Sequence, residues 1–107
     1  MSDSKGMIFF VTVSKEELGE KLARGLVESK IAACVNIIRN ISSIYRWKGD
    51  IEKDEEFLMI IKTSEAKSSE LMNYINQHHT YDTPECVGIK IEKGLPKYLK
   101  WISDSTQ

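Results

Sequence analysis

The sequence has little cysteine, little proline and no long apolar run. Its two cysteines, Cys34 and Cys86, form no C-x-x-C motif, which argues against a redox motif and against a cysteine-rich zinc site. We therefore expect two free thiols. No stretch approaches the roughly 20 apolar residues of a membrane-spanning helix, and the first residues lack the features of a secretory leader. These absences predict a soluble cytoplasmic protein with no membrane partner.

An excess of charge of one sign is also missing. Fifteen Lys and Arg residues stand against sixteen Asp and Glu residues, which leaves a formal net charge of -1. Because there is no large basic field to attract a phosphate backbone, we expect no nucleic acid partner. The length is that of a single domain, residues 1–107, in which residues 1–6 form a polar N-terminal tail.

Motifs of known catalytic chemistry are absent as well. The sequence contains no G-x-S-x-G, no H-E-x-x-H and no phosphate-binding G-x-x-x-x-G-K. The one cysteine that resembles a nucleophile is Cys34, paired with one of the two histidines. It lies in a strand-like run, where a free cysteine usually behaves as a small hydrophobic residue. We therefore expect a protein that is not an enzyme.

The apolar pattern of the first third predicts a strand followed by a helix. A run rich in Phe and Val over residues 7–13 indicates the strand. Ser14 and Glu17 form an S-x-x-E capping box, which marks the start of a helix. Leucines then recur every four residues through about Ser29, so that one apolar stripe must cover a sheet.

The rest of the chain predicts a long hairpin, a second helix and a last strand. Two β-branched and aromatic runs are joined by a short connection containing Gly49, which is typical of a hairpin. Apolar residues at helical spacing follow, and then an alternation of apolar and polar residues. A short helical segment of one or two turns ends the chain's pattern. The expected ranges are 32–47 and 51–63 for the hairpin strands, 64–79 for the helix, 86–92 for the last strand and 98–102 for the terminal segment.

The resulting order, βαββαβ, predicts an α+β fold: a ferredoxin-like sandwich with two helices on one face of an antiparallel sheet. A hairpin strand of 16 residues would reach on the order of 50 Å, whereas a compact domain of this size has a radius of gyration of about 13 Å. The hairpin tip should therefore project, and its apolar side chains need cover. A second copy of the chain is the simplest partner, with Tyr45, Trp47 and Ile51 as interface candidates. The alternative is a bulged or shorter ribbon that folds back on its own core.

Five segments, AACVNI, SIYRWKGDI, IIKT, HTYDTPE and YLKWI, follow one another between Met7 and Ile102. In this order and spacing they resemble the CutA divalent-cation-tolerance proteins. The resemblance implies a ferredoxin-like fold assembled as a compact homotrimer, in which the long hairpins join sheets between subunits. It also implies a response to metal ions, copper among them.

The stretch QHHTYDTPE holds the candidate metal ligands. Adjacent histidines of the family's copper-binding members correspond to His78 and His79, whereas the position of their cysteine ligand is Val11. Without a thiolate, we expect at most weak binding of copper or another divalent ion. Thr80 and Cys86 also depart from the family pattern. The two histidines should end a helix, and because adjacent helical residues diverge by about 100°, both cannot point inward.

Two other functions remain open at this point. A trimer of this kind forms clefts between subunits, as in PII-like signalling proteins, and Lys62, Tyr81 and Glu85 are candidates for such a ligand cleft. A lysine beside a tyrosine would suit an anionic ligand, although Lys62 and Glu85 could instead pair with each other. The third possibility is a scaffold trimer with no ligand. We rank the metal-response trimer first, the ligand sensor second and the scaffold third.

Overall fold

The computed structural model describes residues 5–107. Their elements follow the predicted order, and the expected terminal helical segment is a third helix. They are β1 (Gly6–Val13), α1 (Glu16–Glu28), β2 (Cys34–Trp47), β3 (Asp50–Ser64), a 3₁₀ turn (Glu65–Lys67), α2 (Ser68–His78), β4 (Val87–Lys90) and α3 (Pro96–Ser105). Most of the predicted N-terminal tail lies outside the described residues, and Gly6 already belongs to β1.

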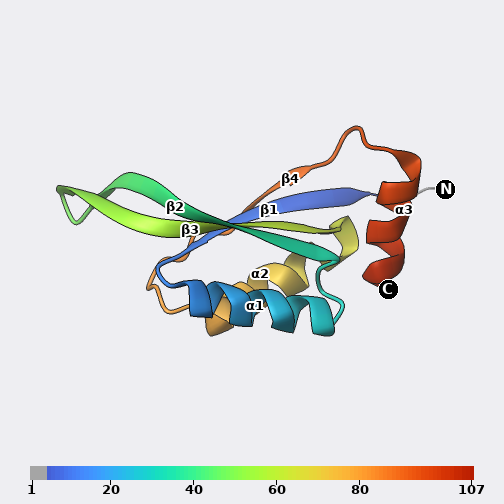
Figure 1. Cartoon of the computed structure of the whole chain (residues 1–107), viewed down its shortest axis with the longest axis horizontal. Helices are drawn as coiled ribbons and strands as arrows, with labels where there is room; N and C mark the ends of the chain where they lie inside the picture. Colours follow the sequence, from blue (N-terminus) through green and yellow to red (C-terminus); the bar gives the residue numbers. More distant parts are fainter. Residues whose placement is uncertain (1–4) are drawn as a thin grey trace.

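The four strands form one antiparallel sheet in the order β2-β3-β1-β4. Helices α1 and α2 lie side by side on one face of this sheet, and α3 lies at the end of the sheet opposite the hairpin tip (Figure 1). The predicted α+β sandwich is therefore confirmed. Within residues 5–107, no helix is long and apolar enough to cross a membrane.

The core lies between the sheet and the two helices. Alternate side chains of β1 point into it, because successive side chains of a strand face opposite sides. The apolar stripes of α1 and α2 meet them, and each fully buried aliphatic or aromatic side chain stabilises the fold by roughly 1.5–3 kcal/mol. The buried cluster includes Met7, Phe9, Val11, Val13, Leu22, Leu26, Met59, Ile61, Leu71 and Ile75.

The opposite face of the sheet is apolar too, but none of the helices in residues 5–107 covers its central part (Figure 1). The register places Ile8, Phe10, Leu58 and Ile60 on this face, together with β4 side chains that are opposite them. Ile89 remains 54% exposed there. We name this surface the open sheet face. Exposed apolar side chains gathered on one surface are of the kind that marks an interaction site.

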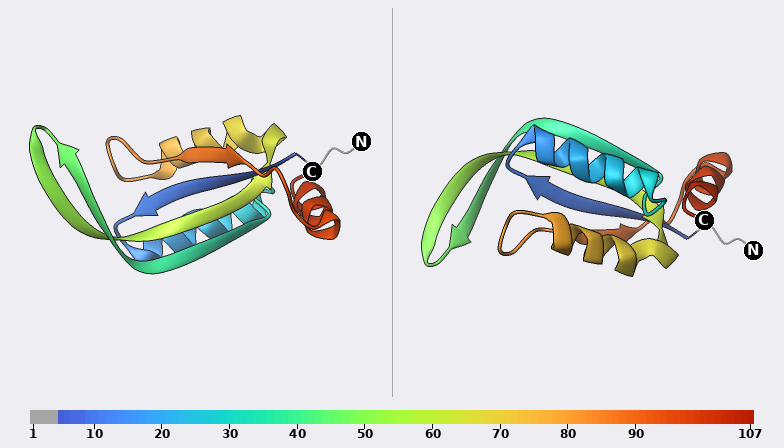
Figure 2. Two further views of the ribbon diagram at one scale, coloured as in Figure 1. Left: turned by 90° about the horizontal axis from the view of Figure 1, so that it is seen from above. Right: turned by 90° about the horizontal axis from the view of Figure 1, so that it is seen from below.

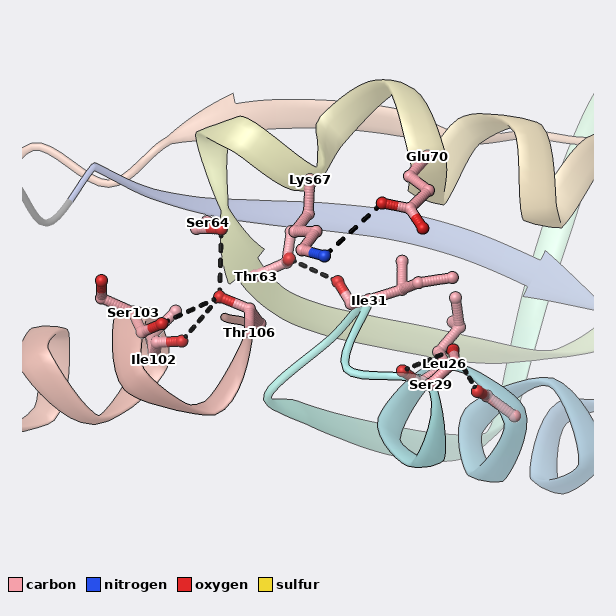
Figure 3. A network of polar contacts seen from close by, with 11 residues as sticks. Leu26, Ser29, Ile31, Thr63, Ser64, Lys67, Glu70, Ile102, Ser103 and Thr106 are labelled. Carbon is pink, nitrogen blue, oxygen red and sulfur yellow. Dashed lines mark hydrogen bonds and ion pairs between the residues drawn. The ribbon is translucent and has the colours of Figure 1, made fainter.

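Helix α3 is longer than the expected one or two turns, since it runs for ten residues. Ile102 anchors it with 1% exposure, and the Thr106 hydroxyl lies 3.0 Å from the Ser64 hydroxyl at the end of β3 (Figure 3). Next to this contact, the buried Thr63 hydroxyl donates to the Ile31 carbonyl at 2.6 Å. These bonds attach both the last helix and the α1–β2 connection to the end of β3.

The distal parts of β2 and β3 form a two-stranded ribbon that projects from the body, as predicted (Figure 1). The molecule accordingly measures 48 Å along its longest axis and 25 and 23 Å along the others. The register of the ladder shifts between Ile38 and Ile41, where Asn40 adopts a φ of 62°. The ribbon is therefore bulged, as the alternative expected, but it does not fold back on its own core. Lys48 and Gly49, both with positive φ, close the ribbon in a tight two-residue turn.

The predicted capping box is wrong. Helix α1 begins at Glu16, after an extended Lys15, and no side chain of the described residues caps it. The Glu16 carboxylate instead accepts a hydrogen bond from Arg39 Nε at 2.8 Å. An acid in the first turn of the helix thus binds the bulged part of β2.

Two other boundaries differ from the sequence expectation. The second helix starts at Ser68 rather than at 64, because β3 continues to Ser64 and a 3₁₀ turn follows. The last strand is shorter than 86–92 and ends at Lys90. Both differences lie at element ends, where local pattern is least informative.

Gly88 in β4 is required by its neighbour across the ladder. It pairs with Phe9, and a Cβ at this position would lie 2.5 Å from the Phe9 ring. We predict that Gly88→Ala lowers the free energy of unfolding by about 1–3 kcal/mol, because the ring cannot move without disturbing the core. Urea denaturation measures the effect. Lys93→Ala, an exposed change nearby, is the control, and equal stability of the two variants would contradict the packing described.

Candidate functional site

The loop between α2 and β4 contains three of the five metal and cleft candidates, His79, Tyr81 and Glu85. Helix α2 ends at His78, and His79 leaves it in an extended conformation. The loop residues that follow pass the base of the ribbon, which curves toward the same edge of the sheet (Figure 2). The helix thus ends before Thr80 and leads into a turn, as expected, but only His78 lies in its last turn.

His79 is fixed by two backbone hydrogen bonds. The Tyr81 N–H donates to its Nδ1 at 3.1 Å, and its Nε2 lies 2.7 Å from the Thr12 carbonyl oxygen. Because Nδ1 accepts, Nε2 carries the proton and donates to Thr12. Both ring nitrogens are therefore used in joining the loop to β1.

His78 has a different environment on the exposed side of the helix end. Its Nδ1 lies 2.8 Å from the Tyr74 carbonyl oxygen, and its ring stacks on the Tyr74 ring with centroids 4.2 Å apart. Among the described residues, nothing hydrogen-bonds to its Nε2. The two imidazoles thus diverge as predicted, and only His78 has a ring nitrogen available to a metal.

The surroundings add few further ligands. Residues 5–107 contain no group of three or more His, Cys, Asp or Glu side chains arranged to hold a metal ion. Val11 is fully buried in the core, so the position of the family's cysteine ligand faces away from solvent here. A site that uses both histidines stays a prediction, and it would require His79 to give up its present bonds.

Tyr81 joins the loop to the ribbon through a buried carboxylate. Its hydroxyl donates to Glu56 Oε2 at 2.6 Å, and Glu56 is only 7% exposed. Burial, and secondarily the bond to Glu56, raise the pKa of Tyr81. Further along the ribbon, the Tyr45 hydroxyl donates to Asp54, and this bond is the main cause that raises the pKa of Tyr45 to about 12.

These groups line a cavity of about 680 Å³ between the ribbon and the loop. We name it the ribbon pocket. Its walls carry four carboxylates and three aromatic rings, with one arginine at the ribbon end. The lining residues are Thr12, Ser43, Ile44, Tyr45, Arg46, Trp47, Asp54, Glu56, Tyr81, Asp82, Thr83 and Glu85.

Two of the three predicted cleft residues, Tyr81 and Glu85, meet in this pocket. Lys62 does not, because it lies on the open sheet face, where its amine donates to the Asn36 side chain. The expected combination of lysine and tyrosine for an anionic ligand is therefore not formed within one chain. Where a lysine was expected, the pocket instead contains the negatively charged Asp54 and Glu56, which were not candidates from the sequence.

The interface candidates lie on the ribbon and are incompletely covered in the single chain. Tyr45 and Trp47 line the ribbon pocket and are 40% and 41% exposed. Ile51 is 64% exposed near the tip. Both cysteines are free thiols, as expected, and burial raises the pKa of Cys86 to about 11.

The family model described as CutA1 divalent ion tolerance protein matches residues 7–105. The chain belongs to this family. The resemblance noted from the sequence is thereby confirmed over these residues.

Individual relatives agree with this assignment. A CutA homolog of Xenopus laevis is 47% identical, over 89% of this chain and 63% of its own length. The divalent-cation tolerance protein CutA of Thermus thermophilus is 37% identical, over 92% of this chain and 96% of its own. The crystal structure of CutA1 from Oryza sativa superposes with a TM-score of 0.93 at 40% identity, covering 96% and 94% of the two chains. The chain thus spans less than two thirds of several longer relatives.

The bond from Tyr81 to Glu56 predicts a measurable loss of stability. Tyr81→Phe leaves a buried carboxylate without its donor, and we expect the free energy of unfolding to fall by about 1–3 kcal/mol. Tyr45→Phe is the matched control: it removes the same atom from a bond to an exposed Asp54 and should cost under about 0.5 kcal/mol. Chemical denaturation compares the two. An equal loss in both variants would show that the burial of Glu56 is not decisive.

Proposed function

We propose that this chain acts as a homotrimer in the response to divalent metal ions and catalyses no reaction. The family match over residues 7–105 carries the proposal, together with relatives named for divalent-cation tolerance. The absence of nucleophile–base motifs from the sequence agrees with a role that is not enzymatic. We place the protein in the cytoplasm, although the names of some relatives mention the chloroplast or the periplasm.

Two surfaces support the trimer. The open sheet face leaves Val87 and Ile89 each 54% exposed, and the ribbon exposes Ile44 and Ile51 to 70% and 64%. A two-stranded ribbon is marginally stable in water on its own. Contact with other copies of the chain would cover both surfaces.

The trimer can be tested by measuring its mass and by placing a charged residue in the proposed interface. Light scattering coupled to gel filtration should give three times the 12.2 kDa of one chain. Ile89→Asp, which buries an unpaired carboxylate in the proposed interface, should dissociate or unfold the assembly. Met72→Asp is the control, since Met72 is 43% exposed on α2, away from the open sheet face. A 12.2 kDa species in the wild type, or a stable Ile89→Asp trimer, would contradict the proposal.

The metal part of the proposal is limited to a weak contact at His78. Copper(II) and zinc accept imidazole nitrogen, and Nε2 of His78 is exposed at the helix end. Water or another subunit would complete the coordination. His79 and Val11 do not fit a tight three-ligand site, for the reasons given above, so no step of the proposed response depends on one.

The two histidines provide matched variants for a metal titration. We expect His78→Ala to lower copper(II) affinity by about tenfold or more, because it removes the available imidazole. His79→Ala should retain most of the affinity but unfold at lower denaturant concentration, since it frees the loop from β1. Calorimetry on tag-free proteins of verified mass measures both. Equal affinity of the wild type and His78→Ala would remove the metal from this helix end.

The ligand sensor is a second candidate function, and the ribbon pocket favours it. The pocket's volume falls within the range of small-molecule sites, and it contains the predicted residues Tyr81 and Glu85. The scaffold trimer with no ligand is what remains if neither the metal titration nor a ligand test succeeds.

A further inference from the structure

We propose that Tyr74 and Gly25 position His78 as a metal ligand. The carbonyl and the ring of Tyr74 hold the imidazole so that the electron pair of its Nε2 faces solvent, and Gly25 makes room for the Tyr74 side chain. The inference rests on the proposed metal contact at His78 and names the residues that support it.

The first observation is the hydrogen bond at Nδ1 of the His78 ring. This nitrogen lies 2.8 Å from the Tyr74 carbonyl oxygen, about one helical turn back along α2. Because a carbonyl oxygen can only accept, Nδ1 carries the proton of the neutral ring and Nε2 holds the free electron pair. Histidine ligands of metals usually donate their other N–H to a carbonyl or a carboxylate in this way. The backbone of α2 thus leaves the exposed nitrogen ready for a metal ion.

The second observation is the stack between the Tyr74 and His78 rings. Residues four apart on a helix are neighbours on its surface, and the two ring centroids are 4.2 Å apart with 27° between the planes. Tyr74 is partly buried and packs against the core cluster, whereas His78 is exposed. A side chain held by the core therefore supports one at the surface, and the bond and the stack together favour one orientation of the imidazole.

The third observation is the close approach of Tyr74 to the other helix. Gly25 lies within α1, and a Cβ at this position would overlap the Tyr74 hydroxyl oxygen. Glycine inside a helix costs about 1 kcal/mol relative to alanine. Only glycine lets the tyrosine lie where it does, so the support of His78 extends to α1.

His79 provides an internal contrast. Its Nδ1 accepts from the Tyr81 N–H, and its Nε2 donates to the Thr12 carbonyl. The adjacent imidazoles therefore hold opposite tautomers, with the proton on Nδ1 in His78 and on Nε2 in His79. The support by Tyr74 thus acts on the one histidine that has an electron pair to offer.

Nitrogen-15 NMR of the imidazoles tests the tautomers directly, because the chain contains only two histidines. In the metal-free protein, at a pH where both rings are neutral, we expect His78 to be protonated at Nδ1 and His79 at Nε2. Tyr74→Leu removes the stacking ring and should mix the tautomers of His78 while leaving those of His79 unchanged. The spectrum of His78→Ala assigns the signals. A wild-type His78 protonated at Nε2 would overturn the proposal.

Copper(II) affinity measures what the support contributes to binding. Without the tyrosine ring, the His78 imidazole spreads over about three rotamers, and an affinity set by the competent fraction falls about threefold. We expect this loss in Tyr74→Leu but not in Tyr74→Phe, which keeps both the ring and the carbonyl. Calorimetry on tag-free proteins of verified mass compares them. Wild-type affinity in a folded Tyr74→Leu variant would contradict the positioning role.

Gly25→Ala acts on the same ring from α1. Its methyl group would displace the Tyr74 hydroxyl, so we expect a loss of copper(II) affinity similar to that of Tyr74→Leu. Adding Tyr74→Phe removes the overlapping oxygen and leaves the nearest ring carbon 3.0 Å from the new methyl. The double variant should therefore recover most of the affinity and the Nδ1-protonated His78. No recovery in a folded double variant would overturn the link through Gly25.

The outcomes separate this inference from the function on which it rests. If Tyr74→Leu fails to fold by circular dichroism, Gly25→Ala and its recovery by Tyr74→Phe decide the question. Equal copper(II) affinity of the wild type and His78→Ala would overturn the metal contact and this inference with it. A loss in His78→Ala without a loss in Tyr74→Leu or Gly25→Ala would overturn this inference alone.

Discussion

The rest of the structure depends on how β1 divides its side chains between the two faces of the sheet. It lies between β3 and β4, and its odd-numbered residues, such as Phe9 and Val11, are buried against the helices. A slip of one residue would exchange the two faces, so this register is strongly specified. It also positions the candidate site, since the Thr12 carbonyl near the end of β1 accepts a hydrogen bond from His79. The core and the loop are therefore positioned by the same strand.

The order of elements and the projecting hairpin could be predicted from the sequence, because both follow from apolar periodicity and chain length. The ribbon pocket could not. Glu56 belongs to an acidic run of the kind that usually lies on a solvent-exposed strand. Its burial depends on a tertiary contact, because Tyr81 comes from a distant loop to donate to its carboxylate. The position of Lys62 on the open sheet face could not be predicted either, since strand alternation gives a face but not which face the helices cover. Its role in a cleft between subunits stays a prediction. The capping box failed because the helix begins at Glu16 with Lys15, not Ser14, at its N-cap.

The adjacent histidines show how similar neighbours can have different roles. His79 uses both ring nitrogens to hold the loop on β1, whereas His78 is exposed with one nitrogen available. The sequence resemblance assigns both histidines the same role as metal ligands. Family membership, which is established over residues 7–105, does not distinguish between them. The tertiary contacts separate a structural imidazole from one that can meet a ligand. A loss of metal response on changing His79 would therefore need a stability measurement before it is assigned to coordination.

The ribbon has a consequence for local dynamics. Beyond the bulge at Asn40, its two strands are held by their ladder and by a few side-chain bonds such as that from Tyr45 to Asp54, with no second layer beneath them. Segments with few buried apolar contacts open at the lowest free energy. In a lone chain, the amide protons of the ribbon would exchange with solvent long before those of β1. Any molecule that covers the ribbon, whether another copy or a bound ligand, would therefore slow exchange most at the tip and least in the core.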